Sequence, residues 1–267
     1  MLAWLFARST GRRFLVRVED LDDRTFPDVA ERQLRDIAAV GVTWDAPPEF
    51  QTAGETRYDA VIAELTGRGL TYECFCSRRD ILQAPRAPHA PEGAYPGTCR
   101  DLSDDERATR RTAGRAPALR LRASIAEYTV TDLLHGSYTG VVDDLVLRRG
   151  DGVPAYNLAV VVDDAAQGVD QVVRGDDLLS SSPRQAYLGS LLGYPQPTYA
   201  HVPLALNAEG KRLAKRDGAV TLAELGIEKA LSLIARSLGF AATTVDGMLA
   251  EFDPARLPRE PWTYQPT

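Results

Sequence analysis

A continuous apolar run, Leu158 to Val162, constrains the fold of this chain more than any other feature. The run is short for a globular helix and rich in β-branched residues, so it predicts a strand buried on both faces of a sheet. It ends at Asp163 and Asp164, and a second short run, Val169 to Val173, ends at Arg174. Because ligands bind outside the carboxyl ends of strands in open α/β sheets, both ends are candidate ligand-binding positions.

Arg174 is the strongest of these candidates. Its planar guanidinium suits carboxylate recognition, and Gly175 lets the backbone turn directly after it. The aspartates carry less weight, since solvated loop charges explain each of them equally well.

Predicted strands and helices alternate along the first part of the chain. Phe14 to Val18 predicts a strand, and helices are expected at residues 2–8, from Pro27 to Gly41, and at residues 55–65. Further along, Ser182 and Pro183 predict a helix N-cap followed by the first helical position. This alternation predicts an α/β fold with a parallel sheet.

Three cysteines form the second chemical signal. Cys74, Cys76 and Cys99 supply three thiolates, one fewer than the tetrahedral set that zinc prefers, and Tyr95 or His89 could complete the site. An odd number of cysteines argues against a disulfide framework. Small buried thiols packed as hydrophobes are the alternative, but the proline- and glycine-rich surroundings favour zinc.

Charge and composition exclude few classes of function. The net charge of −6 argues against broad nonspecific affinity for nucleic acid but permits a local basic face. The apolar start, Met1 to Phe6, is too short for a signal peptide or a membrane span, so we expect a cytoplasmic protein without a membrane partner.

Several other residues have two interpretations. The basic segment from Lys211 to Arg216 is equally consistent with a solvated surface and with a loop that stabilises phosphate charge. His135 and His201 are expected to be structural, and no Ser-His-Asp arrangement is visible in the sequence. Tyr156 could be a core aromatic.

Four segments together resemble the class I glutamyl-tRNA synthetase family: residues 17–22, 155–164, 173–178 and 212–216. The second segment, with the Cys-x-Cys and Tyr-x-x-x-Cys spacing, is similar to the short glutamyl-Q tRNA(Asp) synthetases of that family. The resemblance extends from Leu2 to Leu238.

The resemblance implies a Rossmann-type catalytic domain with a zinc-type insertion and a short helical C-terminal region. Residues 1–73 would form the first half of the catalytic domain, 74–143 the insertion, 144–216 the second half, and 217–267 the C-terminal region without an anticodon-binding domain. It also implies activation of L-glutamate by ATP, with Mg²⁺, to glutamyl-adenylate, and transfer of glutamate to the queuosine base of tRNA(Asp). We expect a monomer.

The resemblance also assigns roles to residues. Glu19, Tyr156 and Arg174 would bind glutamate, and Lys215 would contact ATP and act in catalysis in a KMSKS-type loop. One zinc ion per chain would be held by a set of four residues, namely Cys74, Cys76, Tyr95 and Cys99.

Two departures from the family pattern bear on activity. Ala214 stands where the family commonly has serine. Family members also begin with a strand and a HIGH-type signature that binds ATP, and this chain starts in the helix after it. We therefore expect a truncated chain or a start codon placed too late, with low stability and poor catalysis. The alternatives are a catalytically inactive RNA-binding paralogue and a fragment of a glutamyl-tRNA synthetase.

Overall fold

The computed structural model describes residues 1–21, 27–84, 94–213 and 221–265. Its α-helices are α1 (Leu2–Ser9), α2 (Pro27–Ala39), α3 (Glu55–Gly67), α4 (Arg78–Gln83), α5 (Asp104–Thr112), α6 (Tyr156–Gln167), α7 (Ser182–Leu191), α8 (Leu222–Leu225), α9 (Ile227–Leu238) and α10 (Val245–Glu251). Short 3-10 helices are η1 (Gln51–Gly54), η2 (Asp176–Ser181) and η4 (Pro254–Arg256). The strands are β1 (Arg17–Val18), β2 (Glu49–Phe50), β3 (Thr71–Cys74), β4 (Ala118–Leu121), β5 (Glu127–Asp132), β6 (Gly136–Val141), β7 (Val146–Arg148), β8 (Gln171–Gly175), β9 (Thr198–Val202), β10 (Ala205–Leu206) and β11 (Trp262–Thr263).

A four-stranded sheet in the order β6-β5-β9-β8 carries Arg174 of the candidate site. Strand β9 pairs in parallel with β8 and with β5, whereas β5 and β6 are antiparallel. The register places Arg174 of β8 opposite His201 of β9, and Asp132 of β5 opposite Tyr199 of β9. A second, antiparallel sheet has the order β3-β4-β7. The predicted α/β class is confirmed, with mixed rather than purely parallel pairing.

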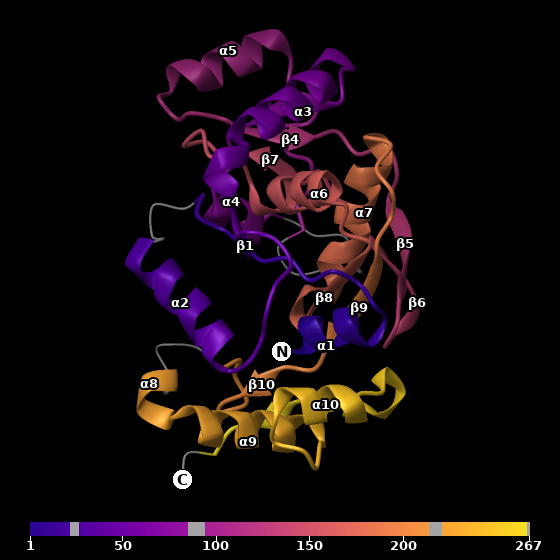
Figure 1. Ribbon diagram of the computed structural model, residues 1–267. Helices are drawn as coiled ribbons and strands as arrows, with labels where there is room; N and C mark the ends of the chain where they lie inside the picture. Colours follow the sequence, from indigo (N-terminus) through magenta and orange to yellow (C-terminus); the bar gives the residue numbers. More distant parts are fainter. Residues whose placement is uncertain (22–26, 85–93, 214–220, 266–267) are drawn as a thin grey trace.

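The central prediction of a strand at Leu158 to Val162 is wrong, because these residues lie in helix α6. The helix ends at Gly168, which adopts the left-handed conformation with φ 67°. Its apolar residues pack against α3, α7 and β7 (Figure 1). The apolar run of a helix covered on several faces is not interrupted by polar residues, so it resembles a buried strand. Tertiary packing here overrides the β-propensity of valine.

Two smaller predictions also needed correction. The strand expected from Phe14 is confined to β1, which pairs in parallel with β2. Helix α7 starts where Ser182 and Pro183 predicted a helix, but its N-cap is Ser181, and Ser182 is its first residue. The Ser182 hydroxyl is therefore available to other partners.

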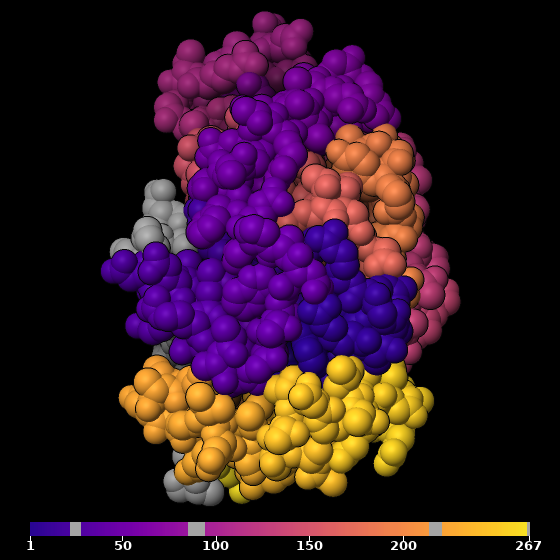
Figure 2. Space-filling view, in the orientation of Figure 1, coloured from indigo at the N-terminus to yellow at the C-terminus, as the bar shows by residue number. Residues whose placement is uncertain are grey.

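Residues near the two ends of the chain pack together. Trp4 and Leu5 of α1 share an apolar cluster with Ala235 of α9 and Met248 of α10. Figure 2 shows the C-terminal residues in yellow against the indigo N-terminal residues. Among the described residues, no helix is long and apolar enough to cross a membrane.

Candidate active site

The three residues expected to bind glutamate line one open cavity. Glu19 follows β1, Tyr156 begins α6, and Arg174 lies in β8. The cavity has a volume of about 580 Å³, and Arg17 and Asp164 also line it. This volume is within the range of small-molecule sites, about 300–1,000 Å³. Glu19 and Arg174, more than 150 positions apart, are thus brought to one cavity. Its lining includes four arginines (Arg12, Arg13, Arg17 and Arg174) and three carboxylates (Glu19, Asp164 and Asp170).

Arg174 is held by neighbours on several sides. Its Nε donates a hydrogen bond to His201 Nε2 at 3.1 Å, and one terminal nitrogen donates to Ser182 Oγ at 2.8 Å. The guanidinium carbon lies 5.6 Å from the ring centre of Tyr199, close enough for a cation–π contact. The orientation of the guanidinium is therefore defined by residues from β9 and α7.

Ser182, His201 and Asp132 form a buried chain that the sequence did not reveal. Ser182 Oγ is 3.0 Å from His201 Nε2, and His201 Nδ1 is 2.6 Å from Asp132 Oδ2. Ser182 and His201 are 0% exposed and Asp132 is 2% exposed. No substrate carbonyl can reach a serine with no exposed surface, so the arrangement does not suit nucleophilic catalysis. His201 does not line the cavity, but it contacts Arg174.

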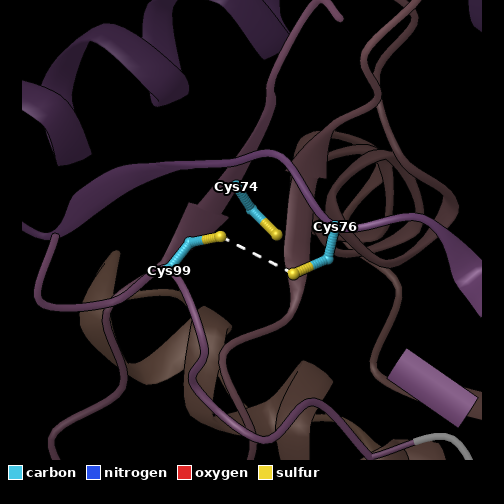
Figure 3. A group of neighbouring side chains, drawn as sticks. All are labelled: Cys74, Cys76 and Cys99. Carbon is cyan, nitrogen blue, oxygen red and sulfur yellow. Dashed lines mark hydrogen bonds between the residues drawn. The ribbon is translucent and has the colours of Figure 1, made fainter. Parts of the chain in front are cut away.

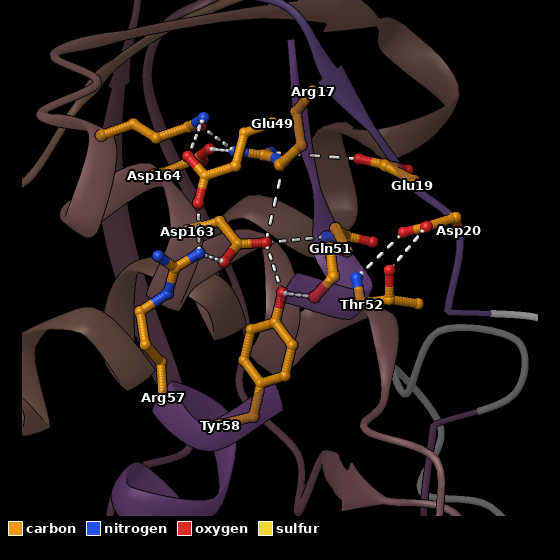
Figure 4. Close-up of polar contacts among 11 residues, drawn as sticks. Arg17, Glu19, Asp20, Glu49, Gln51, Thr52, Arg57, Tyr58, Asp163 and Asp164 are labelled. Atoms are coloured by element: carbon orange, nitrogen blue, oxygen red, sulfur yellow. Dashed lines mark hydrogen bonds and ion pairs between the residues drawn. The ribbon is translucent and has the colours of Figure 1, made fainter. Parts of the chain in front are cut away.

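Arg17 connects the carboxylates beside the cavity (Figure 4). It donates to Asp164 Oδ1 and to Gln167 Oε1, both at 2.8 Å, and its closest distance to a Glu19 carboxylate oxygen is 3.9 Å. Partial burial raises the pKa of Glu19, and the positive charge of Arg17 only partly opposes this. Burial likewise raises the pKa of Asp164 despite its bond to Arg17. Two carboxylates with raised pKa values at one cavity are typical of a functional site.

Asp163 differs from its neighbour Asp164. It points away from solvent, is 0% exposed, and accepts hydrogen bonds from Gln51 Nε2 at 2.9 Å and Tyr58 Oη at 2.7 Å. Arg57 also donates to it at 3.2 Å. Asp163 therefore joins α6 to η1 and α3, and neither of its sequence interpretations, loop charge or ligand contact, is correct.

Tyr156 is a cavity residue and not a core aromatic. Its side chain is 44% exposed at the start of α6. Partial burial raises the pKa of its hydroxyl, and the positive charge of Arg174 partly offsets this effect. The hydroxyl thus remains a neutral donor and acceptor at physiological pH.

The basic segment is described only in part. Ala214, Lys215 and Arg216 lie outside the described residues. Before them, Arg212 donates to Asp177 of η2 at 2.8 Å, and Asn207 Oδ1 accepts from the backbone N–H of Lys211 at 2.9 Å. The described base of this segment is therefore an ordered turn after β10.

The three cysteines lie together, as the zinc prediction requires (Figure 3). Their Sγ atoms are within 4.8 Å of one another, with Cys76 and Cys99 3.6 Å apart. Four ligands around zinc, with Zn–S of about 2.3 Å, place sulfur atoms roughly 3.8 Å apart, so the thiols fit a metal ion. The Tyr95 hydroxyl is 3.4 Å from Cys74 Sγ and 3.9 Å from Cys76 Sγ. His89, the other fourth ligand considered, lies outside the described residues.

The surroundings of the cysteines favour the thiolate form at Cys74 and disfavour it at Cys76. Burial raises the pKa of Cys74, but the Tyr95 hydroxyl and the Arg120 guanidinium outweigh this and leave the pKa lowered. Burial and the neighbouring Cys74 raise the pKa of Cys76 to about 12. Packed thiols of this kind deprotonate together only with a compensating cation, which a bound metal ion supplies.

Comparison with known proteins identifies the family. Residues 1–231 match the family model described as tRNA synthetases class I (E and Q), catalytic domain. The chain is 64% identical to the glutamyl-Q tRNA(Asp) synthetase of Nocardia farcinica, over 98% of this chain and 86% of that protein. It is 42% identical to the glutamyl-Q tRNA(Asp) synthetase of Symbiobacterium thermophilum, over 98% of this chain and 88% of that protein.

Full synthetases share the fold over part of their length. A glutamate-tRNA synthetase structure from Elizabethkingia anophelis has a TM-score of 0.78 at 22% identity, covering 98% of this chain and 63% of that one. The chain thus spans less than two thirds of that solved structure. From the matched catalytic-domain model and the high identity over nearly the whole chain, this protein belongs to the class I tRNA synthetases (E and Q), within the group of glutamyl-Q tRNA(Asp) synthetases.

Proposed function

We propose that this chain activates L-glutamate with ATP and transfers the glutamate to the queuosine base in the anticodon of tRNA(Asp). The observation that carries this proposal is the convergence of Glu19, Tyr156 and Arg174 on one cavity. The names of its relatives point to the same activity.

The charges of the cavity complement those of glutamate. The Arg174 guanidinium has the donor geometry for a carboxylate, and Glu19 has the charge for an ammonium group. Because the α-carboxylate must react, we assign the side-chain carboxylate of the substrate to Arg174. Tyr156, which lines the same cavity, can donate its hydroxyl hydrogen to a substrate oxygen.

Activation joins glutamate to AMP. An oxygen of the α-carboxylate attacks the α-phosphorus of ATP, the bond from that phosphorus to the bridging oxygen of pyrophosphate breaks, and pyrophosphate leaves. Mg²⁺ bound with ATP would offset charge on the phosphates. We propose that Lys215 contacts ATP and offsets the charge that develops on the phosphates. In the second step a nucleophilic group of the queuosine base attacks the carbonyl carbon of the adenylate, and AMP is released.

The metal site would be structural. We propose that one zinc ion per chain is held by Cys74, Cys76, Tyr95 and Cys99, with the sulfur spacing as the support. The cluster lies next to β3 and β4, away from the cavity beside β8. When bound, zinc would hold the segment around Cys99 against β3 and take no part in the transfer.

The remaining organisation follows from this function. We propose catalytic halves at residues 1–73 and 144–216, an insertion at 74–143 and a C-terminal region at 217–267, in a monomeric cytoplasmic enzyme. Within the insertion, β5 pairs with β9 and so contributes Asp132 to the central sheet. With a net charge of −6, tRNA affinity would depend on a local basic surface and fall with rising salt.

Glutamate-dependent ATP–pyrophosphate exchange tests the activation step directly. We expect exchange with L-glutamate at a low rate, in keeping with the poor catalysis expected from the sequence. Labelled glutamate should be transferred to queuosine-containing tRNA(Asp) but not to tRNA(Glu). Transfer to the terminal ribose of tRNA(Glu) would indicate an ordinary glutamyl-tRNA synthetase. A folded chain without exchange would favour the inactive RNA-binding alternative.

The affinity for glutamate should fall in mild acid because of Glu19. Its pKa is raised from 4.5, so the carboxylate loses its charge at a higher pH than an ordinary glutamate would. Only the charged form attracts the ammonium group, so KM for glutamate should rise as the pH falls from 7 toward 5. Glu19→Gln should raise KM at pH 7 by about tenfold and flatten this pH profile. A Glu19→Gln profile as steep as that of the native chain would contradict the assignment.

A further inference from the structure

We propose that His201, fixed by Asp132, and Ser182 are positioning residues that hold the Arg174 guanidinium ready for the carboxylate of the substrate. The inference rests on the proposed function, since it concerns the residue assigned to glutamate. None of the three residues lines the cavity, so their effect would reach the substrate only through Arg174.

The proton positions follow from the chemistry of arginine. Arginine has donors and no acceptor, so His201 Nε2, 3.1 Å from Arg174 Nε, must accept. The ring proton of a neutral His201 then sits on Nδ1 and is donated to Asp132 Oδ2 at 2.6 Å. Asp132 thereby selects the one neutral tautomer of His201 that can accept the hydrogen bond from Arg174.

The hydrogen bonds to Asp132 require its carboxylate to be ionised, because both oxygens only accept. Oδ1 accepts from the backbone N–H of Leu134 at 2.8 Å and of His135 at 2.9 Å. Oδ2 accepts from the backbone N–H of His201 at 3.0 Å as well as from its ring. Four donors face two oxygens, so an asparagine in either orientation would direct an NH₂ group at two N–H groups.

The arrangement leaves the correct donors for a ligand. The two contacts to His201 and Ser182 use two of the five N–H groups of a guanidinium, and three others are not used in them. Tyr199 lies beneath the guanidinium and stacks on His201, with ring centres 5.7 Å apart. Because Ser182 and His201 are fully buried, water does not compete for these bonds. An arginine fixed before binding loses less side-chain entropy when the carboxylate arrives.

Two substitutions of His201 separate positioning from packing. The amide of His201→Asn reaches about the place of Nδ1, so it keeps a donor for Asp132 and loses the acceptor for Arg174. The amide of His201→Gln reaches about the place of Nε2, so it keeps an acceptor for Arg174 and leaves Asp132 without the ring donor. We expect His201→Asn to raise KM and Kd for glutamate about tenfold with KM for ATP unchanged. His201→Gln should raise them less than about threefold while lowering Tm more.

Ser182→Ala provides a second test on the other nitrogen of Arg174. It should raise KM for glutamate about tenfold, whereas Ser181→Ala should have no effect, because the Ser181 side chain makes no cap hydrogen bond. Glutamate affinity is measured by calorimetric titration and folding by circular dichroism. The positioning role is wrong if, in both His201 variants, the rise in KM for glutamate is proportional to the fall in Tm. It is also wrong if Ser182→Ala and Ser181→Ala have the same KM for glutamate. Absence of glutamate binding by the native chain would instead overturn the proposed function.

Discussion

Arg174→Gln is expected to lower kcat/KM for glutamate in ATP–pyrophosphate exchange by at least about 100-fold. Removing one partner of a hydrogen-bonded charge pair at a site costs about 2–5 kcal/mol, largely because the other charge stays unpaired. The side-chain carboxylate of glutamate would enter the cavity without its counterion, and Asp164 and Glu19 would repel it. KM for ATP should change little, since the substitution leaves the segment assigned to ATP intact.

Matched variants distinguish loss of charge from loss of shape. Arg174→Lys keeps the positive charge but loses the planar fork and the Nε donor to His201, so we expect a loss of at least about tenfold. Arg35→Gln, on the exposed surface of α2 with a side chain 70% exposed, should retain native kinetics. If Arg174→Gln had native kinetics for glutamate, the assignment of Arg174 to the glutamate site would be wrong.

Loss of the metal is expected to have the largest effect on stability. The native chain should contain one zinc ion per molecule by elemental analysis, and Cys99→Ser should contain almost none. Structural zinc contributes about 10–16 kcal/mol of apparent binding free energy in small zinc domains at pH 7, so a chelator should lower Tm substantially. All three cysteines of the chain belong to this cluster, so thiol titration should find none reactive until the metal is removed.

Substitution of Tyr95 tests the fourth zinc ligand, and substitution of Tyr72 is the matched control. Tyr95→Phe should weaken zinc binding, because its hydroxyl is the fourth donor close to the sulfurs. Tyr72→Phe removes a hydroxyl in the same apolar cluster, one that donates to Asp144 at 2.6 Å, and should destabilise the fold by about 1–3 kcal/mol without loss of zinc. Native zinc affinity in Tyr95→Phe would place the fourth ligand elsewhere.

The candidate site was more predictable than the local fold around it. Glu19, Tyr156 and Arg174 were identified from short segments that resemble a family, and the structure gathers them at one cavity. The cysteine cluster could be predicted because cysteines in a segment rich in glycine and proline are unlikely to be packed as core residues. The same reasoning misassigned Leu158 to Val162, since a run of five apolar residues carries no period long enough to separate a helix from a strand.

The sequence by itself determined which chemical groups this protein offers: an arginine that can pair with a carboxylate, carboxylates that can pair with an ammonium group, and thiols that can bind a metal. These are properties of single residues and short spacings. Only the tertiary structure decided that Asp132, Ser182 and His201 meet around Arg174, because they come from β5, α7 and β9 and no local spacing relates them. It also decided that Asp163 is buried and Asp164 faces the cavity, since the helical rotation between adjacent residues points their side chains in different directions.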